Sequence, residues 1–288
     1  MPEHMKIRKT VKKRSPYVVA ILLTLLVLIA FISLLVVLPI RMNRPAEDSQ
    51  TQTSDDTTPQ EVATATVDDT VPQTPFAQML SAGEISSIRL VGDSITAGYG
   101  TDGYVNADDE QTGKVIYDNG EGIVHYETSE SAASWANAFR SWAHEQGIDN
   151  FVNAGINGAF MKQLGENPLA WIQEGADVIV VALGTNDAGY YGTDEFAEDA
   201  RYALSAVKGR AKLVVVLSPV ADLRDTSTLV ESAASLGDVL AEICEEQGLV
   251  FCDTRPYVTA EMFGPDGLHP TTEGSLAIWK ALRDTLGI

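Results

Sequence analysis

Residues 178–187 read VIVVALGTND, an uninterrupted apolar run that ends in a polar turn. Because the run lacks the polar–apolar alternation of a strand with one face in water, it is typical of a strand buried on both faces. Such strands belong to parallel sheets that are covered by helices on both sides. The stretch therefore predicts one strand of such a sheet, followed by a loop at its carboxyl end where functional side chains can stand.

Similar apolar runs stand before and after this one, with helix-length segments between them. We predict strands at 87–91, 150–152, 178–183, 213–217 and 249–252. The predicted helices are 132–146, 194–207, 229–247 and 273–286. This alternation indicates an α/β protein, a three-layer α/β/α sandwich around a five-stranded parallel sheet with right-handed crossovers.

Charge divides the chain into two parts. Residues 1–44 carry eight Lys or Arg and one acid, a net charge of +7. Residues 45–288 carry twelve Lys or Arg and thirty-nine acids, a net charge of −27. So acidic a body repels phosphate backbones, and we expect no nucleic-acid partner.

Residues 17–40 form an uncharged stretch of twenty-four residues. As a helix it would span roughly 36 Å, enough to cross a bilayer. Six Lys or Arg precede it, so the positive-inside rule predicts a basic cytoplasmic tail at 1–16 and an extracellular remainder. A cleaved signal peptide is the rival interpretation, but its apolar region usually has only about 7 to 15 residues. We therefore predict a single-pass signal anchor, an arrangement that suits a bacterial cell surface.

The segment after the anchor has a different composition. Residues 45–75 hold ten Ser or Thr, seven acids and four Pro, with no Lys or Arg, which predicts a disordered acidic stalk over 41–75. The remaining residues, 76–288, are enough for one globular domain.

Catalytic groups of parallel sheets sit on the loops that follow the strands. Ser94 follows the first predicted strand and is a weak nucleophile until a base takes its proton. His269 is the candidate base, and Asp266, three residues earlier, can orient its ring. The N–H groups of Ser94 and Gly155 and the side-chain amide of Asn186 are the candidate oxyanion donors.

Four motifs carry these residues, and together they resemble the SGNH hydrolases, also called GDSL-type esterases and lipases. They are GDSITAGYG at 92–100, NAGINGA at 153–159, GTND at 184–187 and DGLHP at 266–270. Ile95 replaces the Leu of the family name. The resemblance implies a flavodoxin-like sheet of order 2-1-3-4-5 and ester hydrolysis without metal or cofactor. It also implies a transient acyl-enzyme on Ser94.

Other motifs would indicate other functions, but the sequence matches them less well. Residues 98–103 fit GxGxxG, but the first Gly lies well past the strand and no helix is predicted directly after it. The chain has no GxSxG and no HExxH, so neither the ordinary α/β-hydrolase elbow nor that zinc site is expected. We expect His144 on a solvated helix face and His125 on the surface, with the substrate mouth as the alternative for His125. Cys244 and Cys252 are expected to be buried free thiols, although an extracellular location would permit a disulfide.

Residues 99–131 are polar, Gly-rich and contain four Tyr, which suits the rim of a site for a sugar-like alcohol. We therefore expect a membrane-anchored extracellular serine esterase that removes short acyl groups, above all acetyl, from carbohydrate. An O-acyltransferase acting on cell-wall sugars and a non-enzymatic wall-binding module are the alternatives. The partners we expect are a small ester or acylated carbohydrate and, through residues 17–40, the membrane.

Overall fold

The computed structural model describes residues 74–105, 114–118, 123–220, 223–224 and 229–288, with the backbone alone for 114–118 and 123–125. They belong to one compact unit, Asp68–Ile288. The predicted tail at 1–16, the membrane segment at 17–40 and the stalk up to residue 73 lie outside these ranges. None of the helices within them combines the length and apolar character that a membrane crossing requires.

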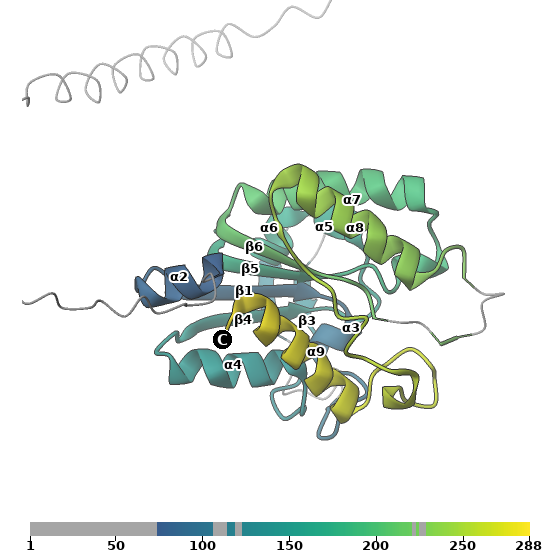
Figure 1. The fold of residues 1–288 in the computed structure, drawn as a ribbon, viewed down its shortest axis with the longest axis horizontal. Helices are drawn as coiled ribbons and strands as arrows, with labels where there is room; N and C mark the ends of the chain where they lie inside the picture. Colours follow the sequence, from purple (N-terminus) through teal and green to yellow (C-terminus); the bar gives the residue numbers. More distant parts are fainter. Residues whose placement is uncertain (1–73, 106–113, 119–122, 221–222, 225–228) are drawn as a thin grey trace, which may run out of the picture. The chain divides into compact units, whose positions relative to one another are not determined.

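The prediction of a five-stranded parallel sheet between helical layers is confirmed (Figure 1). Its strands are β1 (Ser87–Gly92), β4 (Asn150–Gly155), β5 (Ala176–Ala182), β6 (Ala211–Leu217) and β7 (Val250–Cys252). They lie in the order β4-β1-β5-β6-β7, which is 2-1-3-4-5 when the sheet strands are numbered along the chain. Gly92 pairs with both Gly155 and Ala182, so the carboxyl ends of the three neighbouring strands finish level at one edge.

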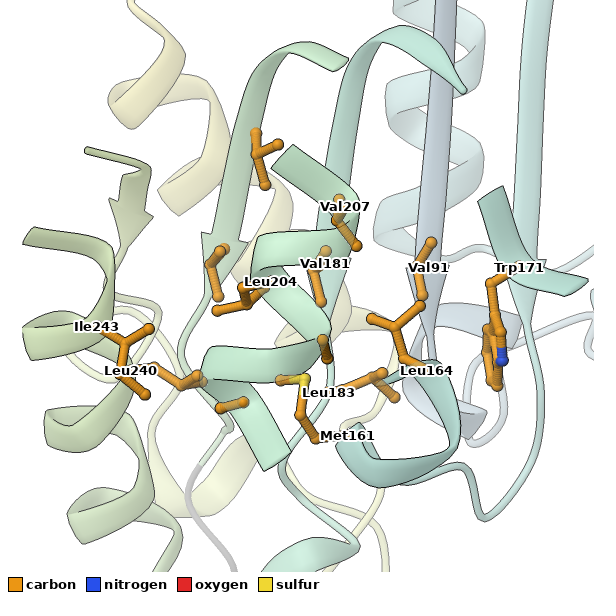
Figure 2. Packing of buried hydrophobic residues seen from close by; sticks show 14 of the residues in the cluster. Val91, Met161, Leu164, Trp171, Val181, Leu183, Leu204, Val207, Leu240 and Ile243 are labelled. Atoms are coloured by element: carbon orange, nitrogen blue, oxygen red, sulfur yellow. The ribbon is translucent and has the colours of Figure 1, made fainter. Parts of the chain in front are cut away.

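Helices cover both faces of this sheet, as side chains alternate between the two faces along each strand. Val91 and Val181 face one apolar cluster, and Leu90 and Val180 face the other. Figure 2 shows Val91 and Val181 in the first cluster, among side chains of the covering helices. That face is covered by α5 (Met161–Glu166), α6 (Pro168–Ile172), α7 (Thr193–Lys208) and α8 (Ala233–Gln247). The opposite face is covered by α2 (Pro75–Ser81), α4 (Trp135–Glu145) and α9 (Thr272–Leu286).

Some helices differ from the sequence-based expectation. Helices α4 and α8 begin later than predicted, because Ser134 and Ser232 accept hydrogen bonds from N–H groups of the first turn and act as N-caps. Helices α2, α5 and α6 were not predicted. Thr74 stands two residues before the predicted start of the domain at residue 76, where it caps α2, and its hydroxyl donates to the carbonyl of Leu286 at the end of α9.

A two-stranded antiparallel sheet lies within the predicted rim segment. It consists of β2 (Lys114–Asp118) and β3 (Ile123–Tyr126), which pair in antiparallel register. The buried Tyr126 hydroxyl donates to the carbonyl of Ala170 at 2.7 Å, which ties the end of β3 to α6.

Cys244 and Cys252 are unbonded and buried, as predicted. Burial raises the pKa of the Cys244 thiol to about 12 and that of Cys252 to about 11. Both therefore stay protonated and unreactive near neutral pH.

Candidate active site

Ser94 lies where β1 turns into the short helix α3 (Ser94–Ala97). The turn is tight: a Cβ on Gly92 would stand 2.0 Å from the Thr96 hydroxyl oxygen. Asp93 caps the helix, and its Oδ1 accepts the N–H of Ile95 at 2.9 Å. The sequence Gly-Asp-Ser thus fixes the Ser94 hydroxyl at the carboxyl edge of the sheet.

Three side chains predicted from distant motifs form a hydrogen-bonded chain here. Ser94 Oγ lies 2.9 Å from His269 Nε2, and His269 Nδ1 lies 2.7 Å from Asp266 Oδ2. The other carboxylate oxygen, Oδ1, accepts the N–H groups of Leu268 and His269, each at 3.0 Å. If Nδ1 carries the ring proton toward Asp266, Nε2 is free to accept the proton of Ser94.

The loop that carries His269 is held by its own backbone. Phe263 and Pro270 form an antiparallel bridge, and the N–H of Gly264 donates to the carbonyl of His269 at 2.8 Å. On the other side Gly100, at φ 88°, passes so close that a Cβ would meet His269 Cβ at 2.9 Å. The Tyr99 ring lies 4.4 Å from the imidazole, measured between centroids. These contacts leave the imidazole little freedom to turn away from Ser94.

Burial competes with hydrogen bonding at Asp266. Partial burial raises the pKa of its carboxyl, but hydrogen bonds from the His269 ring and from the N–H groups of His269 and Leu268 outweigh it and lower the pKa to about 2. Asp266 is therefore ionised throughout the physiological range and can stabilise an imidazolium on His269.

A cavity of about 250 Å³ opens beside the Ser94 hydroxyl. Its walls are formed by Ser94, Tyr99, Asn157, Gly158, Asn186, Leu268 and His269. Asn186 donates one amide hydrogen to the carbonyl of Ala159 at 3.0 Å, which anchors the side chain and leaves its second hydrogen for the cavity. The N–H of Ser94 is the first of helix α3 and has no acceptor within the helix. Both predicted donors therefore border the cavity.

The structure corrects the prediction that Gly155 is the third oxyanion donor. Its N–H donates to Asn153 Oδ1 at 3.0 Å, and it is not among the residues that line the cavity. A Cβ at this position would stand 2.6 Å from the backbone nitrogen of Ala97, so Gly155 serves the close approach of β4 and α3. Gly158, three residues later in the same motif, lines the cavity with φ 71° and is the better candidate.

Residues that the sequence analysis did not single out hold α3 and the loop after β4 in place around the site. Asn153 uses its amide nitrogen to hold the carbonyl of Thr96 at 2.9 Å, so one side chain joins β4 to α3. Glu127 accepts the N–H of Asn157, and Tyr104 accepts the Asn157 amide at 3.3 Å. Asn153 and Asn157 stand in the second motif, which was the available signal, whereas nothing in the sequence singles out Glu127.

Two buried carboxyl groups lie next to the site residues. Burial raises the pKa of Asp93 to about 7, against the lowering effect of N–H donors from Ile95 and Thr96. Burial likewise raises the pKa of Asp187 to about 7, with the negative charge of Asp93 adding to the effect. Asp187 accepts the N–H of Met161 at 3.1 Å, so it holds the segment that follows Gly158.

Of the other histidines, His144 is the one whose side chain lies in the described part of the chain. His144 is exposed in the last turn of α4, as predicted. His125 lies in β3, with its side chain outside the described part, as is the whole of His4. No cluster of three or more His, Cys, Asp or Glu side chains that could hold a metal ion occurs in the described part of the chain.

Comparison with known proteins places the fold and motifs in one family. Residues 90–277 match the model of the GDSL-like lipase/acylhydrolase family. Because this match covers well over half of the chain, the protein belongs to that family and is an esterase by class. The SGNH resemblance of the four motifs is thereby confirmed. No curated protein sequence is similar enough to count as a match.

Solved structures share the fold at low sequence identity. An α/β-hydrolase enzyme from the metagenome of Lake Arreo, Spain, is 15% identical with a TM-score of 0.53, over 70% of this chain and 95% of that one. The acetylxylan esterase of Geobacillus stearothermophilus is 17% identical with a TM-score of 0.53, over 70% of this chain and 94% of that one.

Asp187→Asn tests the buried carboxyl group by its effect on stability. A folded-state pKa of about 7 exceeds the value of about 4 in the unfolded chain, so the stability that Asp187 contributes is full below about pH 4 and falls as pH rises through 7. The asparagine cannot ionise. We expect the Tm of the variant, relative to the parent protein, to rise by roughly 5 °C between pH 4 and pH 8 in thermal denaturation.

The matched control is Asp149→Asn, which changes an exposed carboxyl group. Its Tm relative to the parent should stay constant over the same range. A constant difference for Asp187→Asn as well would mean that its carboxyl group ionises as it does in the unfolded chain.

Proposed function

We propose that this protein is a membrane-anchored serine esterase of the cell exterior that removes short acyl groups, above all acetyl, from carbohydrate. The observation that carries the catalytic part is the chain from Ser94 Oγ through His269 to Asp266, beside a cavity with amide donors. Catalytic mutants of the Geobacillus acetylxylan esterase replace a Ser, an Asp and a His, the last two of which stand three residues apart. Asp266 and His269 have the same spacing.

In this mechanism the Ser94 oxygen attacks the ester carbonyl carbon while its proton passes to His269 Nε2. The carbonyl oxygen becomes an oxyanion, which accepts hydrogen bonds from the N–H groups of Ser94 and Gly158 and from the Asn186 amide. The alcohol then leaves with the proton from His269, and the acyl group remains on Ser94. Water, deprotonated by the same imidazole, attacks the acyl-enzyme and releases the acid.

The size and lining of the cavity support a short acyl group. At about 250 Å³ it lies below the usual range of pockets for drug-sized ligands, about 300 to 1,000 Å³. Tyr99 and Leu268 are the larger apolar side chains among its walls, which otherwise carry hydroxyl, amide, imidazole and backbone groups. The walls thus combine an aromatic ring with groups that can hydrogen-bond the hydroxyls of a sugar alcohol.

The proposal of a membrane anchor and an extracellular domain rests on sequence. Residues 17–40 are uncharged, and the basic residues stand mainly before them. The acidic Ser/Thr-rich stretch that follows has the composition of a spacer between an anchor and a domain.

Hydrolysis of p-nitrophenyl acetate, butyrate and octanoate by the full-length chain tests the catalytic proposal. We expect kcat/KM to fall as the acyl chain lengthens, because the cavity is small. Ser94→Ala should lower turnover by at least about 10⁴-fold while the Tm stays within a few degrees of the parent.

Each other result has a definite meaning. Activity in Ser94→Ala would exclude Ser94 as the nucleophile. Release of p-nitrophenol with the acetyl group recovered on an added sugar, in preference to acetate, would favour the acyltransferase. A folded protein that binds acetylated polysaccharide without turnover would favour the binding module.

Asn186→Ala tests the oxyanion donor separately. We expect kcat for p-nitrophenyl acetate to fall about 10²- to 10³-fold with little change in KM, because the donor acts on charge that exists only in the transition state. The control is Gln146→Ala, which removes an exposed amide side chain at the C-cap of α4 and should leave both constants unchanged. A higher KM with unchanged kcat would assign Asn186 to substrate binding alone.

Fractionation of cells that express the full-length chain tests the anchor. We expect the protein to remain with membranes after carbonate washing and to be digested by external protease in intact cells. A variant with four Leu of residues 17–40 changed to Lys should leave the membrane fraction. Recovery of the parent chain in the soluble fraction would contradict the anchor without bearing on catalysis.

A further inference from the structure

A second cavity lies at the amino ends of the sheet strands, away from the catalytic edge. It measures about 570 Å³ and is bordered by the first residues of β1, β4 and β5 and by the chain that follows α6. Its walls include Ser87, Arg89, Asn150, Gln173 and Glu174. Ser94 follows the opposite end of β1, and a strand rises about 3.3 Å per residue, so roughly 20 Å separate this cavity from the Ser94 hydroxyl.

Arg89 is the unusual member of these walls. It is 93% buried, since only 7% of its surface is exposed, and it occupies a position in β1 that otherwise faces the apolar cluster under α5 to α8. Its neighbours in the sequence, Ile88 and Leu90, are apolar. A buried guanidinium requires several acceptors and a compensating negative charge, because desolvation of a cation is costly.

Neutral groups supply all the acceptors that Arg89 has in the described part of the chain. Nη1 donates to the carbonyl of Trp171 at 3.0 Å and to the Tyr126 hydroxyl at 3.4 Å, and Nη2 donates to the Gln173 amide oxygen at 3.0 Å. Nε is buried and has no hydrogen-bond partner. None of the ion pairs among the described residues includes Arg89. Burial accordingly lowers the pKa of Arg89.

Two other arginines show what the edge formed by Nε and Nη2 of a guanidinium binds when a carboxylate is available. Arg201 donates from Nε and Nη2 to the two oxygens of Glu246, at 2.9 and 3.0 Å. Arg255 likewise donates from Nε and Nη2 to the two carboxylate oxygens of Asp253, at 2.7 and 2.9 Å. In Arg89 the same Nε/Nη2 edge is held by one amide oxygen only. Such an edge is matched to a carboxylate or phosphate.

We propose that this cavity is a second ligand site, in which Arg89 binds the carboxylate or phosphate of a small polar molecule of about monosaccharide size. The anion takes the place of the Gln173 amide on the guanidinium edge, which brings one oxygen to Nη2 and another to Nε. Gln173 is the one non-glycine residue with positive φ in the described part of the chain, at 46°. Backbone strain is thus located at the residue whose side chain must move for the anion to reach Nη2 and Nε. Asn150 offers an amide, and the cavity has the volume of a small-molecule site.

Glu174 provides a way to test the site without disturbing the core. Its carboxylate is exposed and borders the same cavity, where it repels an anionic ligand. Removal of this charge should therefore tighten binding. If Glu174 instead balances the charge of Arg89, its removal should destabilise the fold and leave ligand affinity unchanged.

The experiment measures Tm and calorimetric binding of the full-length chain with glucuronate, glucose 6-phosphate and glucose, each at the same ionic strength set with sodium chloride. We expect saturable binding of glucuronate, glucose 6-phosphate or both, with Tm about 3 °C higher at ten times Kd, and no binding of glucose. Glu174→Gln should lower Kd about 2- to 5-fold. Arg89→Met should raise Kd at least about 10-fold, and Arg201→Met, the control at an arginine that already holds a carboxylate, should leave it unchanged.

Preference for glucuronate would assign the site to carboxylates, and preference for glucose 6-phosphate would assign it to phosphates. Absence of anion-dependent binding, or a Kd that Glu174→Gln does not lower, would overturn the proposal even if Arg89→Met fails to fold. Competitive inhibition of p-nitrophenyl acetate hydrolysis by these anions would also overturn it, because it would place them in the Ser94 cavity. The proposal does not depend on the esterase mechanism, which Ser94→Ala tests separately.

Discussion

The contact between Ser94 Oγ and His269 Nε2 joins two loops that stand 175 residues apart in the chain. It exists because the parallel strands end level at one edge, so that a turn after β1 and a loop before α9 meet there. On one side Gly92 forces a tight turn, and on the other a short bridge between Phe263 and Pro270 shapes the loop. Much of the remaining structure can be seen as support for this distance of 2.9 Å.

The sheet was predictable from sequence because both of its faces are covered. Burial on two sides demands unbroken apolar runs, and the run at 178–183 becomes β5 with little change of boundary. Ser94, Asp266 and His269 were predictable as a group because each stands in a short motif at the expected place around the sheet. The geometry then added what no motif contains, namely which oxygen of Asp266 faces the ring and which oxygen accepts backbone N–H groups.

Other features depend on contacts that the sequence pattern does not record. Gly155 and Gly158 stand in one motif, and only the path of the chain after β4 decides that the first packs on α3 and the second borders the cavity. Helices α5 and α6 are six and five residues long and are separated by Asn167 before Pro168, too short for a helical period to be recognised. Arg89 stands among apolar residues in a strand, so its burial without a carboxylate partner appears only in three dimensions.

The bond from the Thr74 hydroxyl to the carbonyl of Leu286 has a mechanical consequence. It joins the N-cap residue of α2 to the last turn of α9, and the N-cap residue of α9, Thr271, stands two residues after His269. A displacement of Thr74 therefore acts directly on α9, the helix that begins just after the loop of His269.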